Sequence, residues 1–446
     1  MTRTRPSSKT PLRRDLRLVS AEGLSFSVMV GVGESYLAAF VLALGLGEVA
    51  SGLVTTIPLL IGGAIQLVTP LGIRRFGSRR RWAVLCAAIQ AFSFVPLIYG
   101  ALSGALPGSL VFASAAVYWG AGMAVSPAWS AWMERLIPRR VRTQFFARRS
   151  SLGQLGLVVG LAGGGLLLDQ SSRAAMPLFG FAIVFAVALV ARGISASLLA
   201  SQTDVKPVEA PGEGGFPAIR LVTSVPARPV VSLIGYLLSL TAAVTVASPF
   251  FSAYMLAELE LTYLRYMMLV GSALTAKVFA LALAGHAARR FGLAGLLRFA
   301  WIVIAIVPAL WLVSDSYGYL LALQALSGIA WALHEYATFL LLFETIREAR
   351  RVAVLTAFNF GNAVATVGGS LVGGAMLENG GATAYATIFL VSTVARLAAG
   401  ALLVFVVDRK VPEQRPFFRT IAIRPDMGAV LRPILATIRK RTGRRP

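Results

Sequence analysis

Long apolar runs follow one another along almost the whole chain, separated by short polar gaps. Each run holds about 20 residues, which is the length that an α-helix needs to cross the hydrocarbon core of a bilayer. The runs are continuous and lack the alternation of apolar and polar positions that is typical of a lipid-facing β-barrel. The pattern predicts an all-α integral membrane protein with twelve transmembrane helices at 20–43, 49–71, 82–103, 107–133, 150–168, 174–200, 229–256, 262–284, 294–314, 317–343, 352–377 and 384–407.

Composition indicates the same class of protein. Hydrophobic residues make up 57% of the 446-residue chain, charged residues only 14%, and the mean hydropathy is +0.74. A soluble domain usually carries about 25% charged residues, so this chain has too few to cover a globule. The formal charge of +23 would suit a nucleic-acid-binding protein. We expect no nucleic-acid partner, because the basic residues lie in short gaps and not in a basic domain.

Cysteine and histidine are too scarce for a disulfide framework or a multi-histidine metal site. Cys86 is the single cysteine, and His286 and His334 are the only histidines. The sequence shows no phosphate-binding loop and no nucleophile–base arrangement. We therefore expect no cofactor, no bound metal and no enzymatic activity. The lack of a nucleotide-binding module argues against ATP-driven pumping by this chain alone.

The basic residues lie in alternate gaps between the runs. Lysine and arginine concentrate in the N-terminal arm, in the gaps after even-numbered spans and in the C-terminal tail, whereas the other gaps are mainly acidic. Because basic loops remain on the cytoplasmic side, we expect an even number of spans, both termini in the cytoplasm and a location in the cytoplasmic (inner) membrane. The arm and the tail would face an anionic inner leaflet. The tail is either an amphipathic helix on that leaflet or a disordered basic segment.

One long polar interval divides the chain into halves of six spans. It is rich in proline, glycine and mixed charge, which is typical of a linker. The predicted domains are a basic cytoplasmic N-terminal arm (1–19), an N-terminal six-helix bundle (20–200), a cytoplasmic linker (201–228), a C-terminal six-helix bundle (229–407) and a basic cytoplasmic tail (408–446).

A basic turn occurs at equivalent places in the two halves. It consists of Arg74, Arg75 and Gly77 after the second span and of Arg289, Arg290 and Gly292 after the eighth. Glycines also recur 208 residues apart, Gly160 with Gly368 and Gly165 with Gly373. These matches predict two parallel six-helix repeats.

Small residues recur every fourth position in the fifth and eleventh spans. They are Gly156, Gly160 and Gly164 in the fifth span and Gly361, Ala365, Gly369 and Gly373 in the eleventh. Such ladders let helix backbones approach closely in lipid. We expect both helices to pack tightly where the two halves meet.

Together these features resemble the major facilitator superfamily of secondary transporters, over about residues 15–408. The segment RRFGSRRR at 74–81 is similar to the end of that family's loop motif. In the family pattern Pro70 would be a glycine, and an acid that helps to latch the cytoplasmic side would stand at Arg74 and again at Arg289. The resemblance implies secondary active transport of a small solute by alternating access. It also implies a central cavity lined by the first, fourth, seventh and tenth helices.

Ionisable residues inside the predicted spans are few, and such residues are costly in a bilayer and tend to be functional. The candidates are Glu34 in the first span, Lys277 in the eighth, His334 and Glu335 in the tenth and Arg396 in the twelfth. A low dielectric favours the protonated carboxyl, so we predict that Glu335 and Glu34 take up and release a proton during transport, with His334 as a relay. The alternative is that Glu335 pairs permanently with Lys277 or His334 and only holds helices together. For Arg396 we expect snorkelling to the membrane surface or a local pair.

Polar and aromatic residues on one face of the tenth helix match a similar face of the fourth. The substrate-cavity candidates are Trp119, Ser126, Trp331, Thr338 and Lys277. An acid and a base together would suit a zwitterion or an organic anion, and an aromatic lining would suit an amphipathic drug. The sequence leaves open the substrate, the coupling ion (a proton or another ion) and the direction of transport.

A second interpretation is a membrane sensor or assembly partner that keeps this architecture without transporting. The charge reversal at Arg74 and Arg289 gives this alternative some weight, although secondary transport is the preferred interpretation. Flux measured in proteoliposomes would separate the two. We expect the protein to be a monomer.

Overall fold

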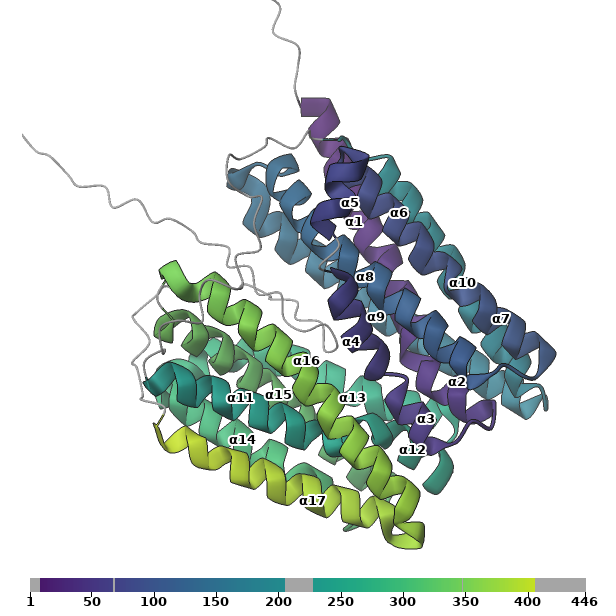
Figure 1. Ribbon diagram of the computed structural model, residues 1–446, viewed down its shortest axis with the longest axis vertical. Coiled ribbons are helices and arrows are strands. Elements are labelled where there is room, and N and C mark those ends of the chain that lie inside the picture. The colour runs from purple at the N-terminus through teal and green to yellow at the C-terminus, as the bar shows by residue number, and fades with distance from the viewer. Residues whose placement is uncertain (1–8, 67–68, 205–227, 347, 406–446) are drawn as a thin grey trace, which may run out of the picture.

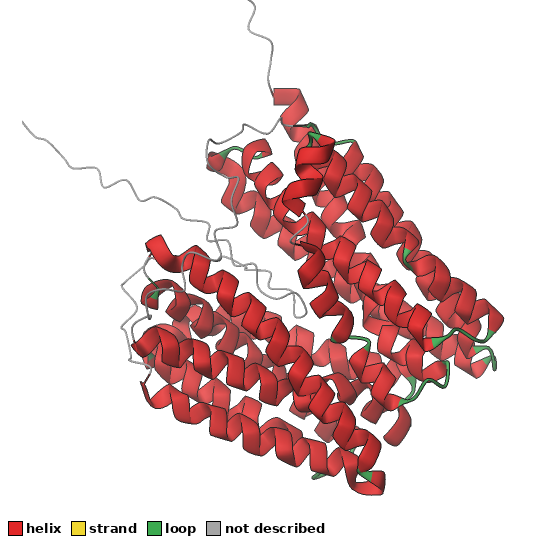
Figure 2. Ribbon diagram, viewed as in Figure 1, coloured by secondary structure: helices red, strands yellow, loops and turns green. Residues whose placement is uncertain are grey.

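The computed structural model describes residues 9–66, 69–204, 228–346 and 348–405, which fold almost entirely as helices (Figure 2). Twelve helical segments in these ranges are long and apolar enough to cross a membrane. The prediction of an all-α multi-pass membrane protein is therefore confirmed. The predicted tail at 408–446, most of the predicted linker and residues 1–8 of the predicted arm lie outside the described residues.

The N-terminal half forms one bundle, coloured purple to teal in Figure 1. Its first helix begins at Lys9, well before the apolar run at residue 20, because a helix can extend beyond the bilayer where its residues are polar. The elements are α1 (Lys9–Val32), η1 (Glu34–Tyr36), α2 (Leu37–Ala43), α3 (Glu48–Leu53), α4 (Ile57–Gln66), α5 (Thr69–Phe76), α6 (Arg79–Phe92), α7 (Phe94–Ser103), α8 (Gly108–Leu136), α9 (Arg139–Arg173) and α10 (Pro177–Ala200).

The C-terminal half forms the second bundle, coloured teal to yellow. Its first span is broken near Pro249 into short 3₁₀, α and π turns. The elements are α11 (Arg228–Ala247), η2 (Ser248–Phe250), α12 (Phe251–Ala253), η3 (Tyr254–Glu258), α13 (Tyr263–Phe291), α14 (Leu293–Leu310), α15 (Tyr317–Thr345), α16 (Glu348–Asn379), η4 (Gly381–Thr383), α17 (Ala384–Ala399) and η5 (Gly400–Phe405).

Equivalent helices make equivalent contacts in the two bundles. In the N-terminal half α1 packs against α9 and α10, and in the C-terminal half α11 packs against α16 and α17. Likewise α4 packs on α8 as α13 packs on α15. The two bundles therefore pack their helices in the same order, as the predicted repeat requires.

The ladder glycines pack inside each half, although the helices that carry them also contact the other half, α9 through α13 and α16 through α3. The expected close packing of these helices is therefore present, but the glycines themselves do not form the contact between the halves. Gly160 on α9 lies against the Val28 carbonyl of α1, where an added Cβ would come within 2.5 Å of the oxygen. Gly369 on α16 lies against the Ala242 carbonyl of α11 at 2.3 Å in the same sense. Among the described residues, a Cβ at Gly368 would meet nothing within 4 Å. The packing counterpart of Gly160 is thus Gly369 and not Gly368, because only one helix face approaches a neighbour.

This contact gives a prediction with a matched control one residue away. Gly369→Ala should lower the thermal stability of the purified protein by about 1–3 kcal/mol, because the new methyl group meets the α11 backbone in a packed interface. Gly368→Ala should leave stability unchanged or raise it slightly, since alanine favours a helix by about 1 kcal/mol over glycine. Thermal unfolding in detergent measures both, and equal melting temperatures would contradict the close approach.

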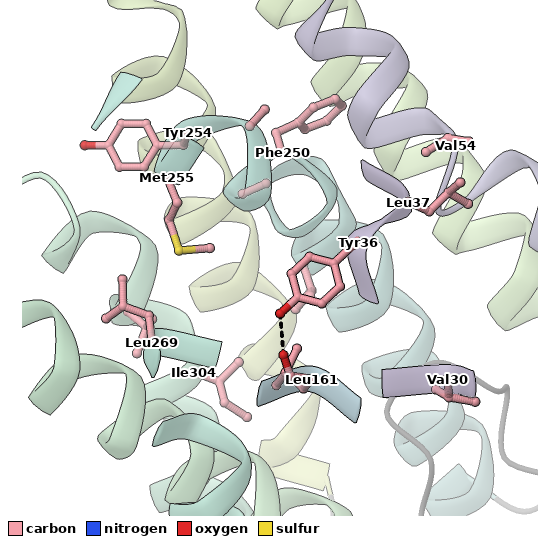
Figure 3. Packing of buried hydrophobic residues seen from close by; sticks show 14 of the residues in the cluster. Val30, Tyr36, Leu37, Val54, Leu161, Phe250, Tyr254, Met255, Leu269 and Ile304 are labelled. Atoms are coloured by element: carbon pink, nitrogen blue, oxygen red, sulfur yellow. Dashed lines mark hydrogen bonds between the residues drawn. The ribbon is translucent and has the colours of Figure 1, made fainter. Parts of the chain in front are cut away.

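The two halves meet near one end of the molecule. There α3 contacts η2, α12 and α16, and α9 contacts α13. In the same region Tyr36 donates a hydrogen bond to the Leu161 carbonyl at 2.5 Å, with Phe250 and Leu269 of the other half nearby (Figure 3). Figure 1 shows the bundles close together at α2, α3 and α12 and diverging toward the end that holds α5.

Candidate transport site

The predicted ionisable residues of the C-terminal half form a buried ion pair. Lys277 on α13 and Glu335 on α15 approach to 2.6 Å between Nζ and Oε1, with side chains 12% and 19% exposed. Glu335 Oε2 is buried and has no hydrogen-bond partner among the described residues. Oε1 of Glu335 is thus paired with the Lys277 ammonium, whereas Oε2 keeps its capacity to accept a hydrogen bond or a proton.

His334 points to a different neighbour from Glu335, although the two are adjacent in the sequence. Its Nε2 lies 3.1 Å from the Tyr236 hydroxyl of α11, and its ring lies against Trp331 at 5.6 Å between centroids. Successive helical residues point about 100° apart. The structure therefore places His334 in the packing between α15 and α11, and a direct proton relay to Glu335 has no hydrogen bond to support it among the described residues.

Glu34 lies on the η1 turn that interrupts the first span. Its Oε2 accepts a hydrogen bond from the Tyr118 hydroxyl of α8. Gly33 precedes it, and a Cβ there would come within 2.9 Å of the Phe94 ring. The short 3₁₀ turn therefore turns a carboxylate toward the fourth span in the N-terminal half.

The remaining cavity candidates differ in burial and in their contacts. Trp119 is only 5% exposed and packs edge-on against the Tyr118 ring. Ser126 and Trp331 are half-buried. The Thr338 hydroxyl is buried without a hydrogen-bond partner among the described residues, one turn along α15 from Glu335. Glu335 and Thr338 thus present two unsatisfied polar atoms on neighbouring turns of one helix.

A charged network in the N-terminal half was not among the predicted residues. Arg149 on α9 pairs with Glu22 on α1 at 2.7 Å, and the Ser195 hydroxyl donates to the other Glu22 oxygen at 3.2 Å. Arg192 on α10 is 2% exposed and donates to the Ser195 hydroxyl at 2.7 Å. Arg192 was detectable as a charge inside the 174–200 run, whereas Glu22 and Arg149 lie at the borders of apolar runs and look like loop charges.

Arg396 does not snorkel and does not form an ion pair in the described residues. It is 4% exposed and donates from Nη1 to the Ile304 carbonyl of α14 at 2.9 Å and from Nη2 to the Val244 carbonyl of α11 at 3.3 Å. Pro308 lies inside α14 and has no N–H to offer Ile304, four residues before it. Val244 lies in the last turn of α11, where carbonyls lack helical donors. Arg396 Nε also donates to the Ser392 hydroxyl one turn earlier at 3.0 Å. A local partner is thus present, whereas the expected snorkelling is wrong, because backbone breaks in two neighbouring helices supply acceptors within the bundle.

Comparison with known protein families gives a match. The family model described as Major Facilitator Superfamily matches residues 232–442. That match covers 211 of the 446 residues, all of them in the C-terminal half of the chain. No curated protein sequence matches the chain.

Several solved transporters share the fold over most of the chain. The crystal structure of a point mutant of the nucleoside transporter NupG is similar with a TM-score of 0.69 and 13% identity, over 88% of this chain and 99% of that one. A bacterial homologue of the iron transporter ferroportin in its inward-facing state gives 0.66 and 16%, over 89% and 98%. A D-xylose-proton symporter gives 0.63 and 18%, over 89% and 98%. The chain therefore shares the fold of these three transporters.

The basic turn that follows the second span recurs after the eighth span, and each ends at a glycine. Gly77 and Gly292 take φ of +62° and +74° and end α5 and α13, a conformation that glycine adopts without strain. Arg74, Arg75, Arg289 and Arg290 are exposed. The next residues carry the contacts: Ser78 donates to Asp204 at 2.7 Å, and Arg80 donates to the Gln202 carbonyl at 3.0 Å. The turn is therefore tied to the chain that follows α10, within its own half.

Proposed function

We propose that this chain is a secondary transporter that moves a small solute across the cytoplasmic membrane by alternating access, coupled to protons through Glu335. The observation that carries the proposal is the buried Lys277–Glu335 pair, whose second carboxylate oxygen has no partner among the described residues. A buried ion pair is a costly way to join two helices, and replacing it with apolar residues is often neutral or stabilising. Its place inside membrane spans therefore favours a functional role over a purely structural one.

The pair gives a simple means of coupling. When a proton binds Glu335, the carboxyl becomes neutral and its attraction for the Lys277 ammonium falls. Lys277 is then free to bind an anionic group of the solute, and Thr338 offers a hydroxyl one turn away. When the solute leaves, Lys277 returns and favours release of the proton. This order supports a small anion or zwitterion as the solute.

The same proposal includes the placement of the chain in the membrane. The arm at 1–19, the linker at 201–228 and the tail at 408–446 lie in the cytoplasm beside an anionic leaflet, and the bundles at 20–200 and 229–407 move against each other as a monomer. The distribution of basic residues supports this orientation. Glu34 acts as a second proton-binding group, since its carboxylate and the Tyr118 hydroxyl join the first and fourth spans.

The Glu335→Gln variant tests the coupling. The amide keeps the size of the side chain and its oxygen still accepts from Lys277, but it does not ionise. A panel of small anions and zwitterions tested by thermal shift on the purified protein first supplies the solute. In proteoliposomes with an imposed pH gradient, we expect the variant to lose about tenfold or more of gradient-driven accumulation while exchange of solute without net proton movement continues.

Two controls distinguish a proton site from a structural pair. Glu378→Gln neutralises an exposed glutamate on α16 and should leave accumulation unchanged. The double variant K277E/E335K exchanges the acid and the base between α13 and α15 and so keeps an ion pair. It should therefore keep the stability of the wild-type protein but lose coupling. Wild-type accumulation by the E335Q variant would overturn the coupling role, and absence of flux for every solute that binds the wild-type protein would favour the sensor interpretation.

A further inference from the structure

The outer face of α1 carries three arginines above an apolar surface. Arg13, Arg14 and Arg17 line a recess of about 470 Å³ together with Leu18 and Ala21. The arginines, Ala21 and Leu24 are exposed, whereas the opposite face of the same turns, with Asp15, Val19 and Glu22, is buried. The basic recess therefore faces away from the bundle.

The basic recess has strong positive charge and no acid to balance it. None of its three arginines has a salt bridge or hydrogen bond to any residue that the structure describes, and the neighbouring Asp15 is 4% exposed and accepts from the Thr203 backbone N–H at 3.1 Å. Like charges one turn apart on a helix repel each other. Guanidinium groups bind phosphate through paired hydrogen bonds, so a phosphate group would relieve this repulsion and satisfy several donors at once.

The apolar half of the recess indicates where the phosphate comes from. Leu18 and Ala21 also line the recess, and Leu24 continues the same exposed face about two turns, or roughly 10 Å, beyond Arg17. An inorganic anion makes no use of such a surface, whereas a phospholipid does, because its acyl chains lie below its headgroup. The order of arginines followed by apolar side chains matches the order of headgroup and hydrocarbon across a membrane surface.

We propose that the basic recess of α1 binds the phosphate of an anionic phospholipid, whose acyl chain lies along Ala21 and Leu24. The site lies on the face of α1 opposite to Glu22, which pairs with Arg149 of α9. The bound lipid therefore covers the outer side of the α1–α9 helix pair. The proposal is independent of the transported solute and of proton coupling.

Lipid binding by the purified full-length protein tests this proposal. The wild-type protein is delipidated in detergent and titrated with phosphatidylglycerol, phosphatidylcholine or inorganic phosphate, with retained lipid counted by native mass spectrometry and stability followed by thermal shift. We expect retention and stabilisation with phosphatidylglycerol only. The variant R13Q/R14Q/R17Q should bind phosphatidylglycerol on the order of 100-fold more weakly, since each basic residue near an anionic lipid surface contributes roughly fivefold.

The control R74Q/R75Q/R289Q removes three exposed arginines elsewhere and should retain the lipid. Ala21→Glu leaves all three arginines in place but puts a carboxylate on the apolar side of the recess, so it should also lose the lipid and serves if the triple variant does not fold. Equal loss in the control variant would overturn the site as a specific one. Binding of inorganic phosphate that displaces phosphatidylglycerol at equal concentration would show a free-anion site and overturn the lipid assignment.

Discussion

The double variant V49C/G374C, made in a Cys86→Ala background, is expected to stop transport when it is oxidised and to recover when it is reduced. Val49 is on α3 of the N-terminal half and Gly374 on α16 of the C-terminal half. A Cβ at Gly374 would lie 3.3 Å from Val49 Cγ1, which is close to the spacing across a disulfide. Cys86 is the single native cysteine and is buried, so its removal leaves the new pair as the only reactive thiols.

The expected effect is large because the disulfide joins the halves at the end where they meet. Alternating access requires these ends to separate when the opposite ends close, and a covalent bond removes the separated state from the ensemble. Flux in proteoliposomes should therefore fall by about tenfold or more on oxidation and return with a reductant. The wild-type protein, with Cys86 buried, should not respond to either treatment.

A disulfide inside one half is the matched control. In S27C/G153C the new bond would join α1 to α9, since a Cβ at Gly153 would lie 3.0 Å from the Ser27 hydroxyl oxygen. Both helices belong to the N-terminal bundle, so this variant should transport in either redox state. Undiminished flux through fully oxidised V49C/G374C would contradict separation of α3 from α16 during transport.

Arg396→Leu should produce the second large effect, on stability. The change leaves the Ile304 and Val244 carbonyls unpaired inside the bundle, and it removes two hydrogen bonds from a charged donor. Each unsatisfied buried group costs about 1–3 kcal/mol, so we expect a loss of roughly 2–5 kcal/mol, seen as a lower melting temperature in detergent. Arg396→Lys should lose less, because a lysine keeps the charge and reaches one carbonyl.

A double-mutant cycle with Pro308→Ala tests the physical reason. Alanine at 308 supplies the N–H that the proline lacks, so the Ile304 carbonyl regains its helical donor. Arg396→Leu should then cost less in the Pro308→Ala background than in the wild-type protein, by about 1 kcal/mol or more. Equal costs in the two backgrounds would mean that Arg396 stabilises the bundle by packing and not by satisfying Ile304.

Much of the fold follows from the sequence, because a bilayer restricts the structures that cross it. Apolar length alone predicts twelve spans, since every backbone polar group in lipid must be paired within a helix. The breaks within spans are harder to predict. The 3₁₀ turn at Glu34 lies inside an apolar run, where hydropathy carries no signal for a local change of helix type, whereas the break after Ala247 coincides with Pro249.

The candidate site likewise combines features that the sequence predicts with features that depend on packing. The sequence identified Lys277 and Glu335 as charges in spans, and it left their pairing as one of several alternatives. Only packing decided it, because α13 and α15 touch while His334 turns toward α11. The Glu22–Arg149 pair was missed because both residues lie at the borders of apolar runs, where charges are ordinary.

The sequence by itself determined the class of protein, the number of spans and the repeat of two halves, because these depend on composition and periodicity along one chain. The tertiary structure alone decided which face of each helix meets a neighbour. Gly369 and Gly368 are adjacent and identical in type, yet one lies against the α11 backbone and the other does not. Arg396 likewise gained its partners from carbonyls left by breaks in two other helices, α11 and α14. Such contacts join residues from different helices, and neither hydropathy nor spacing along the chain encodes them.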